Sequence, residues 1–276
     1  MWNCPACQSP LLRQASQWQC DNNHCYDIAK SGYVNLLLAN QKSSSEPGDN
    51  KLMIDARRSF LQQLYYAPLL HALQELAGRL LEPAPQPEQI KLYDAGCGDG
   101  YYLHGLFSSL VESGVAVRAA ANDISKYAVH VAAKKHAEID FAVASNFKLP
   151  LPSDSQNILL QVFAPSSNGE VLRVLTKGGF WIRVGPGARH LNQLKQVLYE
   201  SAEEHRLDGS IPQGFVEFES ASLSFDFLID DEETRKQLLM MTPFYWAVSE
   251  GKMPLVLAAM TKLTADFAIR VLQKKP

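Results

Sequence analysis

The sequence is poor in cysteine and in long apolar runs, and each shortage excludes a class of protein. The chain has five cysteines among 276 residues, four of them within the first 25. No segment approaches the roughly 20 apolar residues that a membrane-spanning helix requires. The start of the chain, MWNCPACQSP, has no basic patch followed by an apolar core, so we expect no export signal. These features predict a cytoplasmic protein with no membrane contact.

Net charge is also small, at −3. Bulk electrostatics therefore does not predict binding to a polyanion, and any contact with nucleic acid must come from a local patch and from shape. Internal repeats and long low-complexity tracts are missing as well. The length allows one large domain with a small appendage. We predict a cysteine-bearing head at 1–40, a linker with helices at 41–89 and a core domain at 90–276.

The head carries a compact set of metal-ligand candidates. Cys4 and Cys7 are followed by Cys20, His24 and Cys25. Without an export signal, this clustering favours metal over disulfides. Four ligands complete a structural zinc site, and the spacing alone allows either His24 or Cys25 as the fourth. Metal binding would supply the stability that so short a module lacks. The fifth cysteine, Cys97, stands alone, and we interpret it as a small packing residue.

The core shows strands alternating with helices. This order predicts a parallel sheet covered on both faces. A later stretch, 214–229, alternates as antiparallel strands do, and a helix is expected at 231–241. The segment before the core, 50–82, is helical in pattern, between a polar linker at 43–50 and a proline-rich break at 82–89. The expected core strands are 91–96, 117–123, 139–145, 157–163 and 179–185, and the expected helices are 101–114, 125–136, 169–177 and 188–202.

The most informative stretch is LYDAGCGDGYY, in which a strand runs into Gly96, Gly98 and Gly100 and a helix follows. Glycines allow a tight turn and a close approach to a ligand, and the helix N-terminus adds favourable dipoles. A dinucleotide loop would read G-x-G-x-x-G. The spacing here, G-x-G-x-G, resembles motif I of class I methyltransferases, which bind S-adenosylmethionine. For the loop alone, a turn that binds nothing remains an alternative.

This resemblance implies an α/β fold, Rossmann-like, with a mostly parallel seven-stranded sheet preceded by the small zinc module. It also implies that Asp94 holds the amino-acid end of the cofactor through the loop. Asp123, at the end of the second strand, would accept both ribose hydroxyls, because a carboxylate has two acceptor oxygens. Ser145 and Asn146, after the third strand, would contact adenine.

Further blocks make the resemblance specific over nearly the whole chain. They are AKSGYVNLL (29–37), PGD (47–49), ARRSFL (56–61), YYAPL (65–69), ASNFKLP (144–150), FAP (163–165), GPGARHL (185–191) and MTPFYW (241–246). With the head and the glycine loop, they resemble the RlmA family, which methylates N1 of a guanine in 23S rRNA. The resemblance implies zinc held by Cys4, Cys7, Cys20 and His24, with Cys25 as a local extra. It also implies cofactor contacts at Tyr66, Gly98, Asp99 and His190.

The resemblance further implies that the partner is a hairpin loop of 23S rRNA, and it allows a homodimer around one hairpin. Family members differ between neighbouring guanines of that hairpin. The head is then interpreted as an RNA-recognition module. Its expected phosphate contacts are Arg13, Lys30 and Lys42, and its stacking candidates are Trp18 and Tyr33.

Residues outside the head complete this interpretation. Asp49, Arg57 and Arg58 are candidates for substrate handling, and FAP (163–165) is expected to form a pocket wall; no catalytic base is assigned. Two alternatives stay open. One is a methyltransferase of a small molecule or protein, since the fold serves all three substrates. The other is a zinc-bearing RNA-binding protein with a vestigial cofactor pocket.

Overall fold

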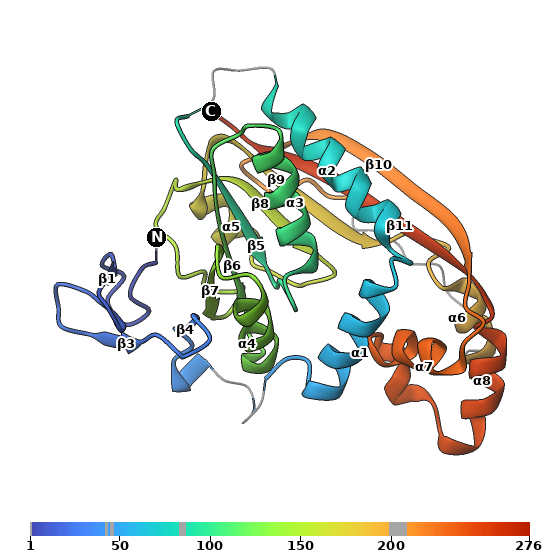
Figure 1. Cartoon of the computed structure of the whole chain (residues 1–276). Coiled ribbons are helices and arrows are strands. Elements are labelled where there is room, and N and C mark those ends of the chain that lie inside the picture. The colour runs from blue at the N-terminus through green and yellow to red at the C-terminus, as the bar shows by residue number, and fades with distance from the viewer. Residues whose placement is uncertain (1, 42–43, 45–46, 83–86, 199–208) are drawn as a thin grey trace.

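The computed structural model describes residues 2–41, 44, 47–82, 87–198 and 209–276 (Figure 1). Its centre is an eight-stranded sheet in the order β10-β11-β9-β8-β5-β6-β7-β4. All neighbouring pairs from β4 to β9 are parallel, whereas β11 is antiparallel to both β9 and β10. The strands are β4 (Val34–Asn35), β5 (Ile90–Ala95), β6 (Val117–Asp123), β7 (Asp140–Val143), β8 (Gln156–Val162), β9 (Leu175–Pro186), β10 (Phe215–Leu228) and β11 (Lys262–Lys274).

Helices cover the sheet, and side-chain caps explain where several of them begin. Asn50, Ser125, Ser167 and Asp231 each accept a hydrogen bond from a backbone N–H in the first turn of the following helix, which satisfies a donor that the helix leaves unpaired. The helices are α1 (Lys51–Gln62), α2 (Ala67–Leu81), α3 (Tyr101–Glu112), α4 (Lys126–Lys135), α5 (Asn168–Val174), α6 (Asn192–Leu198), α7 (Glu232–Met240) and α8 (Met253–Ala259).

Two apolar clusters lie on the two faces of the sheet. Leu92 of β5 belongs to the cluster that includes α1, α2, α3 and α4. Its neighbour Tyr93 points the other way, into a cluster with Trp2, Trp18 and Trp181. Adjacent residues of a strand face opposite sides, so the head and α5 cover the second face. Among the described residues, no helix is both long and apolar enough to cross a bilayer.

The α/β methyltransferase class expected from the sequence is confirmed, with differences in detail. The head adds an eighth strand, β4, which pairs with β7. The helical segment 50–82 is two helices, because Leu64 has a positive φ of 65°. The antiparallel pattern at 214–229 is one long strand, β10, and its partner β11 was not anticipated. The break at 83–86, residues 43 and 45–46 of the linker and the end of the helix expected at 188–202 lie outside the described residues.

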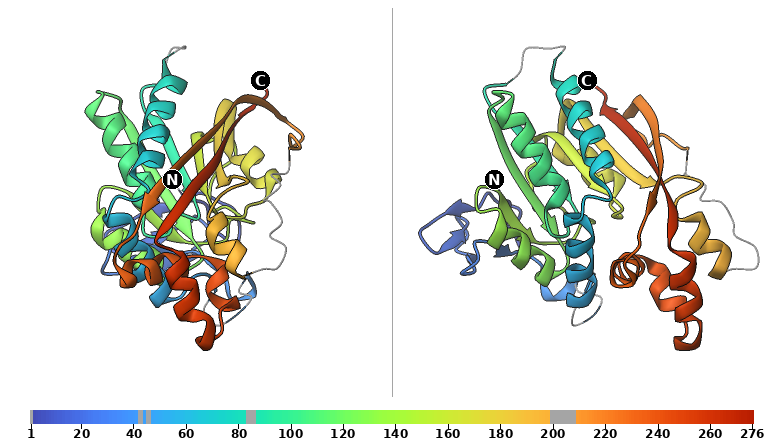
Figure 2. Two further views of the ribbon diagram at one scale, coloured as in Figure 1. Left: turned by 90° about the vertical axis from the view of Figure 1, so that its right-hand side faces the viewer. Right: turned by 45° about the vertical axis from the view of Figure 1, so that its right-hand side comes forward.

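The head itself is a small three-stranded sheet of β1 (Leu12–Arg13), β2 (Gln17–Gln19) and β3 (Cys25–Asp27). Figure 2 shows it, in blue, at the end of the main sheet away from the red helices of the C-terminal part. Three short 3-10 helices complete the description: η1 (Ala39–Gln41), η2 (Pro243–Ala247) and η3 (Glu250–Lys252). The domain boundaries at 40 and 89 stay predictions.

Candidate active site

A cavity of about 710 Å³ opens at the carboxyl ends of β5, β6, β7 and β8. The residues proposed from the sequence as cofactor contacts lie in its lining, with Gly100 as the exception. Those in the lining are Tyr66, Asp94, Gly96, Gly98, Asp99, Asp123, Ser145, Asn146 and His190. Ligands of open α/β sheets bind at this edge of the strands, so the fold brings the candidates together where a ligand is expected.

The glycine loop adopts the conformation that its sequence predicts. Gly96, Gly98 and Gly100 have φ values of 88°, 56° and 81°, a region that side chains disfavour. A Cβ at Gly96 would lie 2.5 Å from the Cβ of Ala164, so no side chain fits between the loop and the segment after β8. Gly100 is a structural residue of α3, because a Cβ there would meet His136 and Phe141. The direct cofactor role expected for Gly100 therefore has no support in the cavity lining.

Asp123 connects the end of β6 to the glycine loop. One carboxylate oxygen accepts a hydrogen bond from Gly98 N at 2.9 Å and the other accepts one from Ser125 N at 2.8 Å. Burial raises the pKa of Asp123, and the hydrogen bonds from Ser125 and Gly98 oppose this rise. Each oxygen retains a second lone pair, so the carboxylate can hold the loop and still accept two ribose hydroxyls.

Asp94 lines the cavity with a buried carboxyl oxygen that no hydrogen bond from the described part of the chain satisfies. Its side chain is buried, and its Oδ1 has no hydrogen-bond partner among the described residues. Burial raises the pKa of Asp94 well above its usual value, and the Asp123 charge adds to the effect. An unpaired buried acceptor is costly, and a cationic ligand group would remove that cost. A sulfonium cofactor with an ammonium group has the charge that this site lacks.

A prediction follows for Asp94→Asn. We expect the affinity for S-adenosylhomocysteine to fall by about 10- to 150-fold, as for the loss of a charged hydrogen bond. The ligand-free variant should be at least as stable as the ligand-free wild type. Because the pKa of Asp94 is raised in the folded protein, this carboxyl lowers the stability of the wild type as pH rises above about 4, the pKa of an unfolded aspartate. Asparagine has no carboxyl to ionise and removes this loss. Calorimetry with S-adenosylhomocysteine tests the expected loss of affinity, and thermal unfolding at several pH values tests the expected stability. A variant that binds as tightly as wild type would contradict the role of Asp94.

Asn146 and Ser145 form the wall beyond β7. Asn122, fully buried, donates through Nδ2 to the Asn146 Oδ1 at 2.8 Å, and the Asn146 Nδ2 donates to the carbonyl of Pro165 at 3.1 Å. The Asn146 amide therefore connects β6 with the segments that follow β7 and β8. This amide fixes the shape of the wall where adenine is expected.

Tyr66 and His190 meet on another side of the cavity. Both are buried, and their rings lie 6.2 Å apart. The backbone N–H of Asp266 donates to His190 Nδ1 at 3.2 Å, which leaves Nε2 as the protonated nitrogen of a neutral ring. Burial raises the pKa of Tyr66, so its hydroxyl stays protonated and able to donate. Their contact with the cofactor stays a prediction.

Asp49 and Arg57 also line the cavity, whereas Arg58 does not. Arg57 pairs with Asp49 at 2.6 Å, and Arg58 pairs with Asp55 at 3.5 Å. The carbonyl of Asp49 accepts a hydrogen bond from Ser125 Oγ at 2.8 Å, which fixes the linker end against the start of α4. The structure thus brings Asp49 and Arg57 to the cavity and separates Arg58 from it.

The metal-ligand candidates of the head converge on one point. Cys4 Sγ and Cys20 Sγ lie 3.6 and 3.5 Å from His24 Nδ1, and Cys7 Sγ lies 3.7 Å from Cys20 Sγ. Zinc bonds of about 2.3 Å to sulfur and 2.1 Å to nitrogen, arranged tetrahedrally, require about 3.8 Å between sulfurs and 3.6 Å between sulfur and nitrogen. The four residues therefore fit a zinc ion. Exposed Cys25 is outside this group and donates to the Asn23 carbonyl.

The surroundings of these ligands favour metal binding. Hydrogen bonds from Asn22 and Ser9 lower the pKa of Cys7 to about 5, whereas burial raises the pKa of the neighbouring Cys20. A metal ligand must be a thiolate, and the polar contacts of Cys7 favour that form. The Tyr26 hydroxyl lies 3.3 Å from Cys4 Sγ and can donate to a thiolate there. Such outer contacts orient the ligands.

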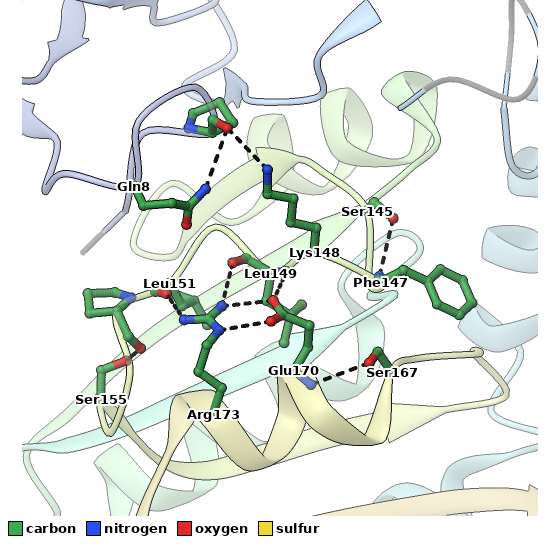
Figure 3. Close-up of polar contacts among 12 residues, drawn as sticks. Gln8, Ser145, Phe147, Lys148, Leu149, Leu151, Ser155, Ser167, Glu170 and Arg173 are labelled. Carbon is green, nitrogen blue, oxygen red and sulfur yellow. Dashed lines mark hydrogen bonds and ion pairs between the residues drawn. The ribbon is translucent and has the colours of Figure 1, made fainter. Parts of the chain in front are cut away.

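The head also braces one wall of the cavity. Figure 3 shows Lys148 donating to the carbonyl of Pro5 in the head, next to Ser145 and Phe147 of the cavity lining. Asn3 N donates to the Pro150 carbonyl at 2.9 Å. From the other side, the Arg173 guanidinium donates to the carbonyls of Leu149 and Leu151. The loop after β7 is therefore held between the head and α5.

Two expectations about the head are wrong, and one lies outside the described residues. Trp18 and Tyr33 are only 4% and 6% exposed, because both pack into the apolar clusters, so neither can stack on RNA. Arg13 remains exposed and lies over the Trp18 ring, 3.6 Å from Asp140. Lys42 is outside the described residues. Residues that the sequence analysis missed are the aromatic side chains Phe147, Phe244 and Trp246, which also line the cavity.

The strand order, the glycine loop after β5 and the acid at the end of β6 define a class I S-adenosylmethionine-dependent methyltransferase. Comparison with known proteins narrows this class. Residues 2–45 match the family described as the RlmA N-terminal zinc ribbon. A Micromonospora griseorubida protein with the provisional name 23S rRNA (guanine-N(1)-)-methyltransferase is 30% identical over 99% of this chain and 96% of its own length. The chain therefore belongs to the family of 23S rRNA (guanine-N1)-methyltransferases.

Two further relatives carry related names. The 23S rRNA (guanine(748)-N(1))-methyltransferase of Streptomyces fradiae is 34% identical over 71% of this chain and 66% of its own. A Bacillus subtilis (strain 168) protein, with the provisional name 23S rRNA (guanine-N(1)-)-methyltransferase, is 26% identical over 93% of this chain and 90% of its own. The family expected from the sequence is confirmed.

Proposed function

We propose that this chain transfers the methyl group of S-adenosylmethionine to N1 of a guanine in a hairpin loop of 23S rRNA, with zinc bound in its head. The observation that carries the proposal is the cavity, in which Asp94, Asp123 and the glycine loop surround one space in a chain of this family. The proposed substrate, ribosomal RNA, supports a cytoplasmic location. A homodimer around one hairpin stays a prediction.

The reaction requires the protein to place the guanine beside the methyl donor and to let the proton on N1 leave. N1 carries this proton at neutral pH, so it departs before or during methyl transfer, and no residue is assigned as its acceptor. The cofactor supplies a methyl group on a sulfonium, which is a good donor. Guanine N1 lies on the Watson–Crick edge, so the target base must be unpaired or turned out of its stack to enter the cavity. The residues of this chain then align the base and exclude water. The ion pair of Asp49 and Arg57 in the lining supports their interpretation as residues that handle the substrate.

The direct test uses unmodified 23S rRNA and a labelled methyl donor. We expect the full-length protein to label this RNA, and mass spectrometry of the digested product to give 1-methylguanosine. Primer extension should stop at the modified nucleotide, because a methyl group on N1 blocks pairing. Parallel reactions with a metabolite pool and with ribosomal proteins test the other substrate classes. Label in either pool and none in RNA would overturn the proposal.

A second measurement addresses the vestigial-pocket alternative. Calorimetry of the full-length protein with S-adenosylhomocysteine should give a saturable binding signal. A flat titration would favour a zinc-bearing RNA-binding protein without enzymatic activity.

A further inference from the structure

The cavity has an aromatic side that the cofactor residues do not explain. Phe163 and Trp246 line it, although 47% and 66% of their surfaces are exposed. Exposed aromatic rings around a pocket provide stacking surfaces for unpaired bases. We propose that Phe163 is the platform on which the target guanine stacks and that Trp246 covers the base from a second segment of the chain. This inference rests on the proposed function.

The strand order separates Phe163 from the expected cofactor path. In the sheet, β5 with the glycine loop lies between β8 on one side and β6 and β7 on the other. Asp123 is the last residue of β6 and Asn146 follows β7, so we expect the ribose and adenine to extend from the glycine loop toward β7. Phe163 follows β8, on the opposite side of the loop. A methyl acceptor has to approach from the side that the nucleoside leaves open, and Phe163 lies at that side, directly after β8.

The segment that carries Phe163 lies close to the glycine loop, and the Phe163 ring packs against two other aromatic rings. It lies 5.5 Å from the His190 ring and 5.9 Å from the Phe267 ring. The next residue, Ala164, is so close to Gly96 that only glycine fits there. A base stacked on the free part of this ring therefore lies next to the loop that holds the methyl donor.

The backbone of Phe163 is strained, and buried groups hold it in place. Its φ is 52°, a left-handed conformation that bulky residues seldom adopt. Phe163 N donates to the Val184 carbonyl at 3.0 Å, and the side chain of Gln161 donates to the Ala164 carbonyl. Strain that the surroundings maintain is typical of functional positions.

Gln161 makes this support rigid. It is buried, and its Oε1 accepts hydrogen bonds from Trp181 Nε1 and Ser166 Oγ, both at 3.0 Å. Its amide thus connects β9, the Ala164 carbonyl and the segment before α5. A base that stacks on Phe163 meets a surface that is already ordered, which reduces the entropy cost of binding.

Trp246 reaches the same cavity from a distant part of the sequence. It lies in η2, after α7, and its ring packs edge-on against Tyr245 at 5.3 Å. The start of η2 is anchored to α7, because Thr242 Oγ1 donates to the Leu239 carbonyl at 2.7 Å. The segment between β10 and β11 therefore supplies an aromatic ring to the cavity at the carboxyl ends of the parallel strands.

The test replaces the ring and keeps the apolar character. We expect Phe163→Leu and Trp246→Leu each to lower kcat/KM for unmodified 23S rRNA by about 5- to 150-fold, the range for losing one stacked base. Phe163→Tyr retains the ring and should stay within about threefold of wild type, since aromatic faces of similar size stack alike. Affinity for S-adenosylhomocysteine, measured by calorimetry, should change less than about twofold in all three, since stacking concerns the base alone.

Phe218→Leu is the matched control, because Phe218 is 49% exposed and lies on β10, outside the cavity lining. It should keep full activity. If wild type labels RNA and both leucine variants retain wild-type kcat/KM, the platform is wrong and the proposed function stands. If the wild-type protein labels no RNA, the proposed function is wrong, and the stacking proposal that rests on it is wrong as well. A Phe163→Leu protein that loses S-adenosylhomocysteine binding together with activity would place the ring in cofactor binding and overturn the proposal.

Discussion

Asp123→Asn is expected to weaken S-adenosylhomocysteine binding by about 100-fold or more and to abolish measurable methyl transfer at ordinary cofactor concentrations. Both oxygens of the carboxylate already accept backbone N–H groups, from Gly98 and Ser125. An amide has one acceptor oxygen, so its NH₂ group must face one of these donors. The change therefore disturbs the glycine loop and removes the ribose acceptor together. Losing one charged hydrogen bond alone accounts for about 10- to 150-fold.

The control for this variant is Asp154→Asn. Asp154 is exposed, pairs with Lys274 at 2.6 Å and is outside the cavity lining. Its φ of 50° suits asparagine, which tolerates the left-handed region. This protein should bind S-adenosylhomocysteine as wild type does. Calorimetry with both variants, at matched thermal stability, checks the prediction, and an Asp123→Asn protein with wild-type affinity would show that the ribose is held elsewhere.

The sequence predicted those parts of the site that depend on local pattern. Three glycines at fixed spacing require positive φ values, and Gly96, Gly98 and Gly100 have them. Asp123 ends a strand next to that loop, and parallel strands place such ends at one edge. The three candidate cysteine ligands of zinc were found for a similar reason, since a cysteine pair at short spacing leaves its two sulfurs close together. The fourth candidate, His24, came from the family resemblance, because spacing alone also allowed Cys25. In each case the contact is set within a few residues or by the order of neighbouring strands.

Contacts between distant segments were not predictable in this way. Nothing in the sequence near Trp18 indicates that the head packs on the main sheet, so its ring was expected to be free for RNA and is buried instead. Trp246 reaches the cavity only because the segment between β10 and β11 folds back over it. Gly100 was expected to contact the cofactor because of its position in the motif. In the structure it lies against His136, where a Cβ would be only 3.3 Å from the histidine ring. The surroundings of these residues depend on tertiary packing, which the local sequence pattern does not indicate.

The burial of the head has a consequence for zinc removal. Cys20 and Trp18 belong to the same apolar cluster as Tyr93 and Ala95 of β5. The head is also bonded to the loop after β7 through Asn3 and Lys148. Because metal binding supplies most of the folding free energy of so small a module, about 10–16 kcal/mol apparent, its loss should expose part of that cluster. The effect of zinc removal should therefore extend to the wall that carries Ser145 and Asn146.

We expect Cys20→Ser to lose zinc and to lower the unfolding midpoint of the full-length protein by about 10 °C. Amide hydrogen exchange at 144–150 should rise, because the head no longer braces that loop, and S-adenosylhomocysteine affinity should fall with it.

The matched control is Cys25→Ser, since Cys25 is exposed and outside the ligand group. Elemental analysis should find one zinc per chain in wild type and in Cys25→Ser, and none in Cys20→Ser. Zinc retained by Cys20→Ser but lost by Cys25→Ser would show that the metal uses the other cysteine. Loss of zinc with unchanged exchange at 144–150 would show that the head and the cavity fold independently of each other.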